Sequence, residues 1–183
     1  MKKTTVIGVA ALLSLSSSVF ANEFVDEAGA EFIFNADISG FDSGTAVAFK
    51  ASKKMEDVVE GFSVEGELTK SLSGPSLSET YWGSSFNTEV SYFTLAAFGK
   101  YTHEVNDKIS LHARGGLGFT SWEATWSGSG VSASDSGTDI GISYGFGGAY
   151  AYSDTMSVTA SYSVYDVDTE SVSHIGVGAS MLF

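Results

Sequence analysis

The chain ends in Ser173-His174-Ile175-Gly176-Val177-Gly178-Ala179-Ser180-Met181-Leu182-Phe183, a stretch in which apolar residues recur at every second position. Side chains of a strand alternate between its two faces, so one face here carries Ile175, Val177, Ala179, Met181 and Phe183. A sheet surrounded by water rarely ends on a large exposed aromatic residue, whereas a strand that closes a barrel in lipid can do so. The terminal stretch therefore predicts the closing strand of a membrane-embedded β-barrel.

Residues 1–21 have the features of a secretory signal peptide. Two lysines near the start precede a mostly apolar run over residues 4–15, and Val19 and Ala21 occupy the two small-residue positions before a cleavage site. The apolar run is shorter than the roughly 20 residues that a membrane-spanning helix needs. The sequence therefore predicts export, cleavage after Ala21 and a single mature domain over residues 22–183.

Composition narrows the class of protein further. The formal net charge of the chain is −13, which argues against binding to nucleic acid or to an anionic lipid surface by charge alone. Cysteine is absent, so no disulfide bridge stabilises the exported domain. Glycine is abundant with 21 residues, and proline occurs once. These values are typical of a chain made of strands.

Eight alternating segments follow the signal peptide, separated by turn-forming residues. They cover residues 29–38, 45–52, 62–70, 88–102, 108–122, 139–152, 156–166 and 173–183. Compact turns alternate with polar loops, of which residues 71–87 and 123–138 form the longest. In outer-membrane barrels the short turns are periplasmic and the longer loops are extracellular. The sequence therefore predicts an all-β fold, an eight-stranded antiparallel up-and-down transmembrane β-barrel with both termini on the periplasmic side.

A soluble, lipocalin-like barrel is the main alternative, because its strands also alternate, with the polar face outside. Here the polar face is made of small residues, such as Ser157, Thr159, Ser161 and Ser163. Small side chains suit the narrow interior of an eight-stranded barrel, whereas a face in water normally carries more Lys and Glu. Tyrosines and tryptophans near both ends of the segments predict aromatic girdles at the two membrane interfaces. The pattern favours lipid outside.

The alternation also predicts the pairing of neighbouring strands. We expect Gly148 to face Ala160 and Phe146 to face Tyr162, and we expect Lys100 to face His112 or Ser110. In the first segment, Phe32, Phe34, Ala36 and Ile38 are expected on one face.

The second half of the chain resembles the OmpA/OmpX-like family of small outer-membrane β-barrels. The resemblance rests on Phe98-Gly99-Lys100-Tyr101, Asn106-Asp107, Arg114-Gly115-Gly116-Leu117-Gly118 and Thr138-Asp139-Ile140-Gly141, and it continues to Phe183. It implies a porin-family barrel in the outer membrane of a Gram-negative bacterium, surrounded by outer-membrane lipids and lipopolysaccharide. It also implies insertion by the outer-membrane assembly machinery through the strand that ends at Phe183. A monomer without a periplasmic peptidoglycan-binding domain is expected.

Several titratable residues are predicted to point into the barrel, and they are Glu65, Glu67, Lys100, His112 and Arg114. Buried charges must be paired, because their desolvation is otherwise too costly. We therefore expect a structural network of ion pairs in the lumen. The alternative is a gate whose opening passes ions or small solutes, although side chains largely fill a barrel of eight strands.

Two tryptophans beside or in the predicted loop 123–138 are candidate binding residues. Trp122 and Trp126 continue the fifth segment, and exposed aromatic side chains there are candidate anchors for a host or surface ligand. The alternative is that both belong to the aromatic girdle.

Enzyme chemistry finds little support in the sequence. A lipid A-modifying enzyme needs a Ser and a His within hydrogen-bond reach, and barrel deacylases carry a His-x-Ser element that none of His103, His112 and His174 begins. No close spacing of metal ligands occurs, so no cofactor or metal is expected. The predicted function is a non-enzymatic structural or adhesin-like role through the extracellular loops. A narrow channel is the alternative, followed by a lipid A-modifying enzyme.

Overall fold

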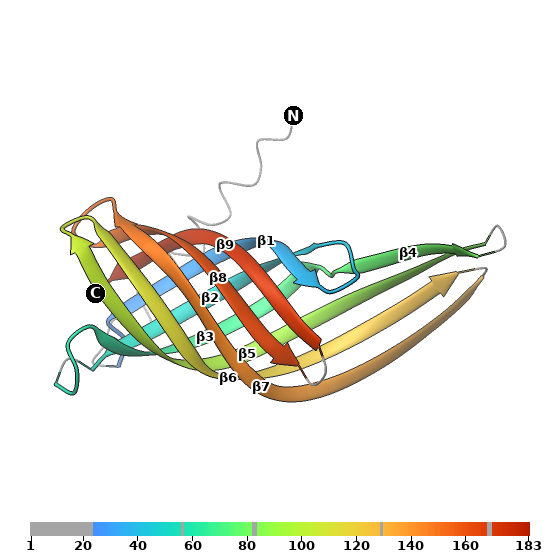
Figure 1. Cartoon of the computed structure of the whole chain (residues 1–183), viewed down its shortest axis with the longest axis horizontal. Helices are drawn as coiled ribbons and strands as arrows, with labels where there is room; N and C mark the ends of the chain where they lie inside the picture. The colour runs from blue at the N-terminus through green and yellow to red at the C-terminus, as the bar shows by residue number, and fades with distance from the viewer. Residues whose placement is uncertain (1–23, 56, 82–83, 129, 168–169) are drawn as a thin grey trace.

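The computed structural model describes residues 24–55, 57–81, 84–128, 130–167 and 170–183 and places most of them in strands (Figure 1). The predicted signal peptide lies outside the described residues. Among the described residues, no helix is long and apolar enough to cross a membrane. The strands are β1 (Glu27–Ile38), β2 (Gly44–Lys54), β3 (Phe62–Ser73), β4 (Ser76–Tyr81), β5 (Ser84–Asn106), β6 (Ile109–Gly128), β7 (Val131–Ala151), β8 (Met156–Val167) and β9 (Glu170–Leu182).

Eight of these strands close a ring. Neighbours pair antiparallel in the order β1-β2-β3-β5-β6-β7-β8-β9, and β1 pairs with β9 along most of its length. The short strand β4 lies outside the ring and pairs with β5. The predicted eight-stranded antiparallel up-and-down β-barrel is therefore confirmed, with β9 as its closing strand.

The outer surface of the ring is apolar, as the alternation predicts. Large exposed apolar side chains occur on strands all around it, including Val64, Leu68, Leu95, Leu117, Phe119, Ile142, Phe146, Val158 and Val177. A continuous apolar surface of this kind is favourable in hydrocarbon and unfavourable in water. Tyr101, Tyr150 and Tyr152 are exposed near the short turns, where a girdle is expected.

Most of the predicted strand register is present, and one pair is wrong. Gly148 faces Ala160 and Phe146 faces Tyr162, as expected. Lys100 faces Arg114 rather than His112 or Ser110. The turn between β5 and β6 lies later in the chain than the sequence indicates, at residues 107 and 108, after a register shift between Glu104 and Asn106. The side chain of Asn106 holds it there by accepting hydrogen bonds from the backbone amides of Lys108 and Ile109 at 2.9 and 3.0 Å.

The first segment does not keep one face throughout. Phe34 is 48% exposed, whereas Ala36 is fully buried in the lumen. The register of β1 shifts between Ile33 and Asn35 against β9, and between Ile33 and Ala36 against β2. A β-bulge adds one residue on one strand and so moves the following side chains to the opposite face. The expectation that Phe34 and Ala36 share a face is wrong for this reason.

The two longest predicted loops are strands. β3 continues to Ser73, β4 and the start of β5 form a hairpin, and β6 and β7 continue to Gly128 and from Val131. Together they form a four-stranded sheet that extends beyond the ring at one end, shown at the right of Figure 1. We call residues 76–81, 84–91, 123–128 and 131–136 the projecting sheet. The short turns and the C-terminus lie at the other end of the ring, which we call the turn end.

The ring closes at the seam where β1 pairs with β9, and the close packing of the two strands there leads to a prediction. A Cβ atom on Gly178 would overlap the carbonyl oxygen of Ala30 and lie 2.7 Å from the Cα atom of Glu31. Gly115 on β6 has open space at the same position. We predict that Gly178→Ala destabilises the barrel by about 1–3 kcal/mol, whereas Gly115→Ala does not. The measurement is the fraction of protein that migrates as a folded barrel on unheated gels during a urea titration. Equal midpoints for the two variants would show that the seam is not closely packed.

Candidate functional site

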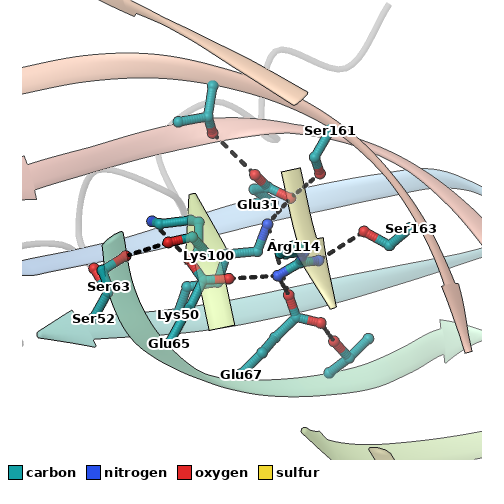
Figure 2. A network of polar contacts seen from close by, with 12 residues as sticks. Glu31, Lys50, Ser52, Ser63, Glu65, Glu67, Lys100, Arg114, Ser161 and Ser163 are labelled. Atoms are coloured by element: carbon teal, nitrogen blue, oxygen red, sulfur yellow. Dashed lines mark hydrogen bonds and ion pairs between the residues drawn. The ribbon is translucent and has the colours of Figure 1, made fainter. Parts of the chain in front are cut away.

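Arg114 lies at the centre of a cluster of charged side chains inside the ring (Figure 2). Its Nη1 atom is 2.6 Å from Glu65 Oε1 and 2.6 Å from Glu67 Oε2. Its Nη2 atom donates to Ser163 Oγ at 2.6 Å. The guanidinium also lies over the ring of Phe98, 4.3 Å from the centroid, a distance typical of a cation–π contact. One side chain on β6 thus joins strands β3, β5 and β8 across the lumen.

Two lysines extend the cluster toward the turn end. Lys100 Nζ is 2.8 Å from Glu65 Oε2 and 3.5 Å from Glu27 Oε2. Lys50 Nζ is 2.6 Å from Glu31 Oε2 and 3.6 Å from Glu67 Oε2. We call the six inner residues of this set the lumen network, namely Glu31, Lys50, Glu65, Glu67, Lys100 and Arg114, and the more exposed Glu27 lies at its margin. The six contain three cations and three carboxylates, so their formal charges cancel.

Hydroxyl groups satisfy the remaining carboxylate oxygens. Ser161 donates to Glu31 Oε2 at 2.6 Å, and Thr159 donates to Glu31 Oε1 at 3.1 Å. Thr69 donates to Glu67 Oε1 at 2.9 Å, and the hydroxyl of Tyr165 donates to the same atom. A buried ion pair is tolerated only when such additional hydrogen bonds complete it. The small polar residues of β8 therefore leave room for the charges and also bind them.

His112 was also expected in the network but lies outside it. Within the part of the chain that the structure describes, its side chain makes no hydrogen bond or ion pair to a member of the lumen network. Its half-buried side chain lines a cavity of about 70 Å³ together with Lys100 and Glu27. A larger hollow of about 560 Å³, lined in part by Glu60 and Thr102, lies beside it at the turn end. The polar space of the lumen is therefore at the turn end.

Sequence reasoning missed Glu31 and Lys50, although the signal for both was present. Val47, Phe49 and Ala51 are assigned to the lipid face by the alternation, and the same alternation places Lys50 inside. Glu31 likewise precedes the outward-facing Phe32 and is 5% exposed.

Aromatic and aliphatic side chains fill the lumen on the other side of the network. The hydroxyl of Tyr92 is hydrogen-bonded to His174 Nε2 at 2.9 Å, and the two rings stack with centroids 5.6 Å apart. The ring of Tyr165 lies 4.8 Å from that of His174. An apolar cluster follows, made of Ile33, Ala36, Ala46, Ala48, Tyr92 and Val172, with Ile38 and Trp122 packed against it. These layers occupy the lumen between the network and the projecting sheet.

The two candidate binding tryptophans do not lie in a loop. Both belong to β6, on the face that continues the lumen side rather than the lipid side, so neither belongs to the lipid-facing girdle. Trp122 is half-buried, and its indole Nε1 donates to Asp139 Oδ2 at 2.8 Å. The expectation that Trp122 is an exposed anchor beside a loop is wrong for this reason. Trp126 is 42% exposed and stands on the projecting sheet.

The two ends of the barrel domain are joined at the turn end. Asp26 Oδ1 is 2.9 Å from Lys53 Nζ, and Asp26 Oδ2 accepts a hydrogen bond from the Lys54 amide at 2.7 Å. The hydrogen bond from Lys53, followed by that from Lys54, holds the pKa of Asp26 below its usual range. The backbone carbonyl of Asp26 accepts from the amide of Phe183 at 3.0 Å. The C-terminal residue is thereby fixed beside the start of β1.

A closed ring of eight antiparallel strands, with an apolar outer surface and a charged, filled lumen, defines a small membrane β-barrel. The family model described as "Outer membrane protein beta-barrel domain" matches residues 7–183. The chain therefore belongs to this family of outer-membrane barrels, as its resemblance to the OmpA/OmpX-like proteins implies. No curated protein is similar enough in sequence to match the chain.

Solved structures show the same fold at low sequence identity. Ail, the attachment invasion locus protein of Yersinia pestis, is 17% identical with a TM-score of 0.57, and the match covers 87% of this chain and 99% of Ail. Neisserial surface protein A is 16% identical with a TM-score of 0.60, over 87% of this chain and 96% of that protein. The N-terminal barrel domain of Pseudomonas aeruginosa OprF is 10% identical with a TM-score of 0.57, over 88% and 100%.

The pairing in the lumen network leads to a prediction about stability. Arg114→Ala leaves Glu65 and Glu67 buried with one cation fewer, and we expect it to destabilise the barrel by about 3–5 kcal/mol. The measurement is the midpoint of urea unfolding in lipid vesicles. Lys108→Ala, at an exposed position in the next turn, is the matched control and should leave the midpoint unchanged.

A compensating variant separates lost pairing from lost packing. Adding Glu67→Gln to Arg114→Ala removes the one uncompensated negative charge, because Glu65 keeps Lys100 and Glu31 keeps Lys50, and should recover part of the lost stability. If Arg114→Ala unfolds at the same urea concentration as the natural chain, the network does not stabilise the ring.

Proposed function

We propose that this protein is an outer-membrane surface protein with a non-enzymatic role, in which the barrel anchors the projecting sheet for interaction with a partner outside the cell. The observation that carries the proposal is the projecting sheet itself. Strands β5, β6 and β7 continue beyond the ring at the end opposite the short turns, and β4 pairs with β5 there (Figure 1). In barrels of this class that end is extracellular. A rigid sheet offers a defined surface where flexible loops would lose conformational entropy on binding.

The edge of the projecting sheet supports the proposal. Among the described residues, residues 131–140 of β7 pair with β6 alone, whereas the carbonyl of Asp166 in β8 lies beside Gly141 and the ladder between β7 and β8 begins at Ser143. The other edge of this segment carries backbone amide and carbonyl groups available to a further strand. Proteins usually cover or shorten such an edge unless it has a use.

The lumen supports a structural role over a channel. The ion pairs of Arg114 and the layer of Tyr92, Tyr165 and His174 fill the section between the turn end and the projecting sheet. A narrow channel would require these paired charges to separate. We propose that the lumen network is a structural core of the barrel and that His112, expected in this network from the sequence, is not part of it.

Export and surroundings complete the proposal. Residues 1–21 act as a cleaved signal peptide, and residues 22–183 insert as a monomer through the assembly machinery that reads the strand ending at Phe183. Outer-membrane lipids and lipopolysaccharide surround the apolar belt. No metal or cofactor takes part, and Trp126, rather than Trp122, is the exposed aromatic anchor on the projecting sheet.

The relatives agree with a surface role but not with one particular ligand. The name of Ail refers to attachment and invasion, and Ail has been crystallised with the heparin analogue sucrose octasulfate. In this chain, residues 71–99 and 115–183 contain no Lys or Arg. A sulfated ligand needs cations, so we do not propose one for the projecting sheet.

The role of the projecting sheet can be tested by removing it. We predict that joining Ser71 to Tyr92 and Trp122 to Gly137 through Asn-Gly turns leaves a folded barrel but abolishes binding of expressing bacteria to host-cell monolayers. Gel migration of unheated samples verifies folding, and the measurement is the number of bound bacteria. Cells with the natural chain and cells without it are the controls. Equal binding by the shortened and natural proteins would overturn the proposed function.

A further inference from the structure

We infer that the hollow at the turn end is a binding site for a small organic cation with primary ammonium groups, and that Glu27 is its main anchor. The hollow lies at the opposite end of the molecule from the projecting sheet (Figure 1). Three features support the inference, which are a deep polar cavity, a carboxylate without a close partner and an excess of negative charge. None of them depends on the proposed function.

The cavity has a size suited to a small molecule. The hollow of about 560 Å³ is lined at its rim by the exposed Glu60 and Glu104, and it adjoins the cavity of about 70 Å³ beside Lys100 and His112. We call the two together the turn-end pocket, and the lining residues that they share are Glu27, Ser52, Thr102, Ser110 and Ala149. Sites for small molecules commonly have volumes of roughly 300–1,000 Å³. The lumen network lies beyond the pocket, so its floor is closed.

Short side chains on several strands create this space. At this level the lining residues of β2, β3, β6, β7 and β8 are Ser52, Ser63, Ser110, Ala149 and Ser157. Side chains of ordinary size fill the interior of an eight-stranded barrel, so short ones on five strands leave a cavity. Their hydroxyl oxygens accept hydrogen bonds. The wall of the pocket is therefore suited to a ligand with several N–H donors.

Glu27 has the weakest contacts of the lumen carboxylates among the described residues. Its Oε2 atom is 3.5 Å from Lys100 Nζ and accepts a hydrogen bond from Ser52 Oγ at 3.4 Å. Lys100 is held more closely by Glu65, at 2.8 Å. Each of the three carboxylates of the lumen network has a contact of 2.6 Å. Charge-assisted hydrogen bonds normally measure about 2.7–2.9 Å, so Glu27 can bind a further cation without breaking a close ion pair.

Formal charge favours a cation over an anion. The hollow is lined by three carboxylates, those of Glu27, Glu60 and Glu104, and by one lysine, Lys54. The charges of the adjoining lumen network cancel, so the pocket keeps a negative excess. Among the described residues, no group of three or more His, Asp or Glu side chains is placed to hold a metal ion. An ammonium group instead needs one carboxylate and neutral acceptors, because it has three N–H donors.

The carboxylates lie at two depths, which favours a ligand with two ammonium groups. Glu27 reaches Lys100 at the floor of the pocket. Glu104 lies on β5 as Lys100 does, four residues closer to the turn, which is about 13 Å along the strand. A short diamine can therefore place one ammonium group at Glu27 and direct the other toward the rim.

The test uses the full chain in lipid nanodiscs, which leave both ends of the barrel accessible. The probes are three soluble molecules with the same central carbon chain, namely the diamine putrescine, the neutral diol butanediol and the dicarboxylate adipate. We expect putrescine to bind about tenfold or more tightly than either of the others, because only putrescine donates charge-assisted hydrogen bonds to Glu27. Isothermal titration calorimetry gives the affinities, and nanodiscs without the protein show any binding to lipid.

Variants locate the site. Glu27→Gln should weaken binding of putrescine about tenfold or more, whereas Glu79→Gln, on the projecting sheet, should leave it unchanged. Ala149→Leu fills part of the pocket without changing its charge and should also weaken binding about tenfold or more. Ala160→Leu, at an exposed position on the lipid side, is the matched control. Migration on unheated gels verifies folding, and the second variant keeps the test decisive if the first folds poorly.

Two results would show that the inference is wrong. One is binding of adipate as tight as that of putrescine. The other is normal binding of putrescine by both Glu27→Gln and Ala149→Leu. Binding of putrescine that Glu79→Gln weakens as much as Glu27→Gln would reflect general attraction to an acidic surface, and it would overturn the inference as well. Each of these results leaves the proposed function standing, because the host-cell assay tests the opposite end of the molecule.

Discussion

The guanidinium of Arg114, held between Glu65 and Glu67, is the interaction on which the rest of the barrel depends. A ring of eight strands is too narrow to hydrate charges freely, so each charge inside must find a partner. Arg114 on β6 reaches carboxylates on β3, a hydroxyl on β8 and the ring of Phe98 on β5. The small residues that line β7 and β8 follow from this, since larger side chains would occupy the space of the network.

The network also divides the molecule into two ends with different chemistry. Toward the short turns, the lumen is polar and contains the hollows near Glu27 and His112. Toward the projecting sheet, Tyr92, Tyr165 and His174 lead into an apolar cluster against which Trp122 packs. One face of the projecting sheet continues the lumen side and carries Phe86, Trp126 and Val131 together with Glu79 and Asp135. The exposed aromatic side chains of the projecting sheet therefore lie on the same face of the strands as the side chains that pack inside the ring.

Much of the fold could be predicted from the sequence, because lipid outside and a narrow lumen inside impose a strict alternation. This constraint identified the ring, the closing strand at Phe183 and the inward direction of Glu65, Glu67, Lys100 and Arg114. The prediction from alternation was wrong where a strand is irregular or lies outside the bilayer. At Ile33–Ala36 a bulge changes the face without any change in composition. Outside the bilayer, serine and threonine suit both loops and hydrated strands, so the projecting sheet had no apolar pattern on its lipid side to mark it.

At the candidate site, too, the alternation predicts which way a side chain points but not where a strand ends or which partner it contacts. Glu31 and Lys50 follow the alternation and were accessible to sequence reasoning, as was the direction of Trp122, which has the parity of the inward-facing Arg114. Trp122 was expected at the end of its strand beside the loop, whereas β6 continues for six residues beyond it. The hydrogen bond to Asp139 depends on the pairing of β6 with β7, which polar sequences on both strands do not specify.

The claim that paired charges and packed side chains close the lumen is tested most directly by the conductance of the purified protein in planar lipid bilayers. The structure predicts no sustained current steps at moderate voltage and intermittent leakage from Arg114→Ala, in which the central cation is removed. Regular, long-lived open states of the natural chain would contradict the account and would show that the lumen network is a gate.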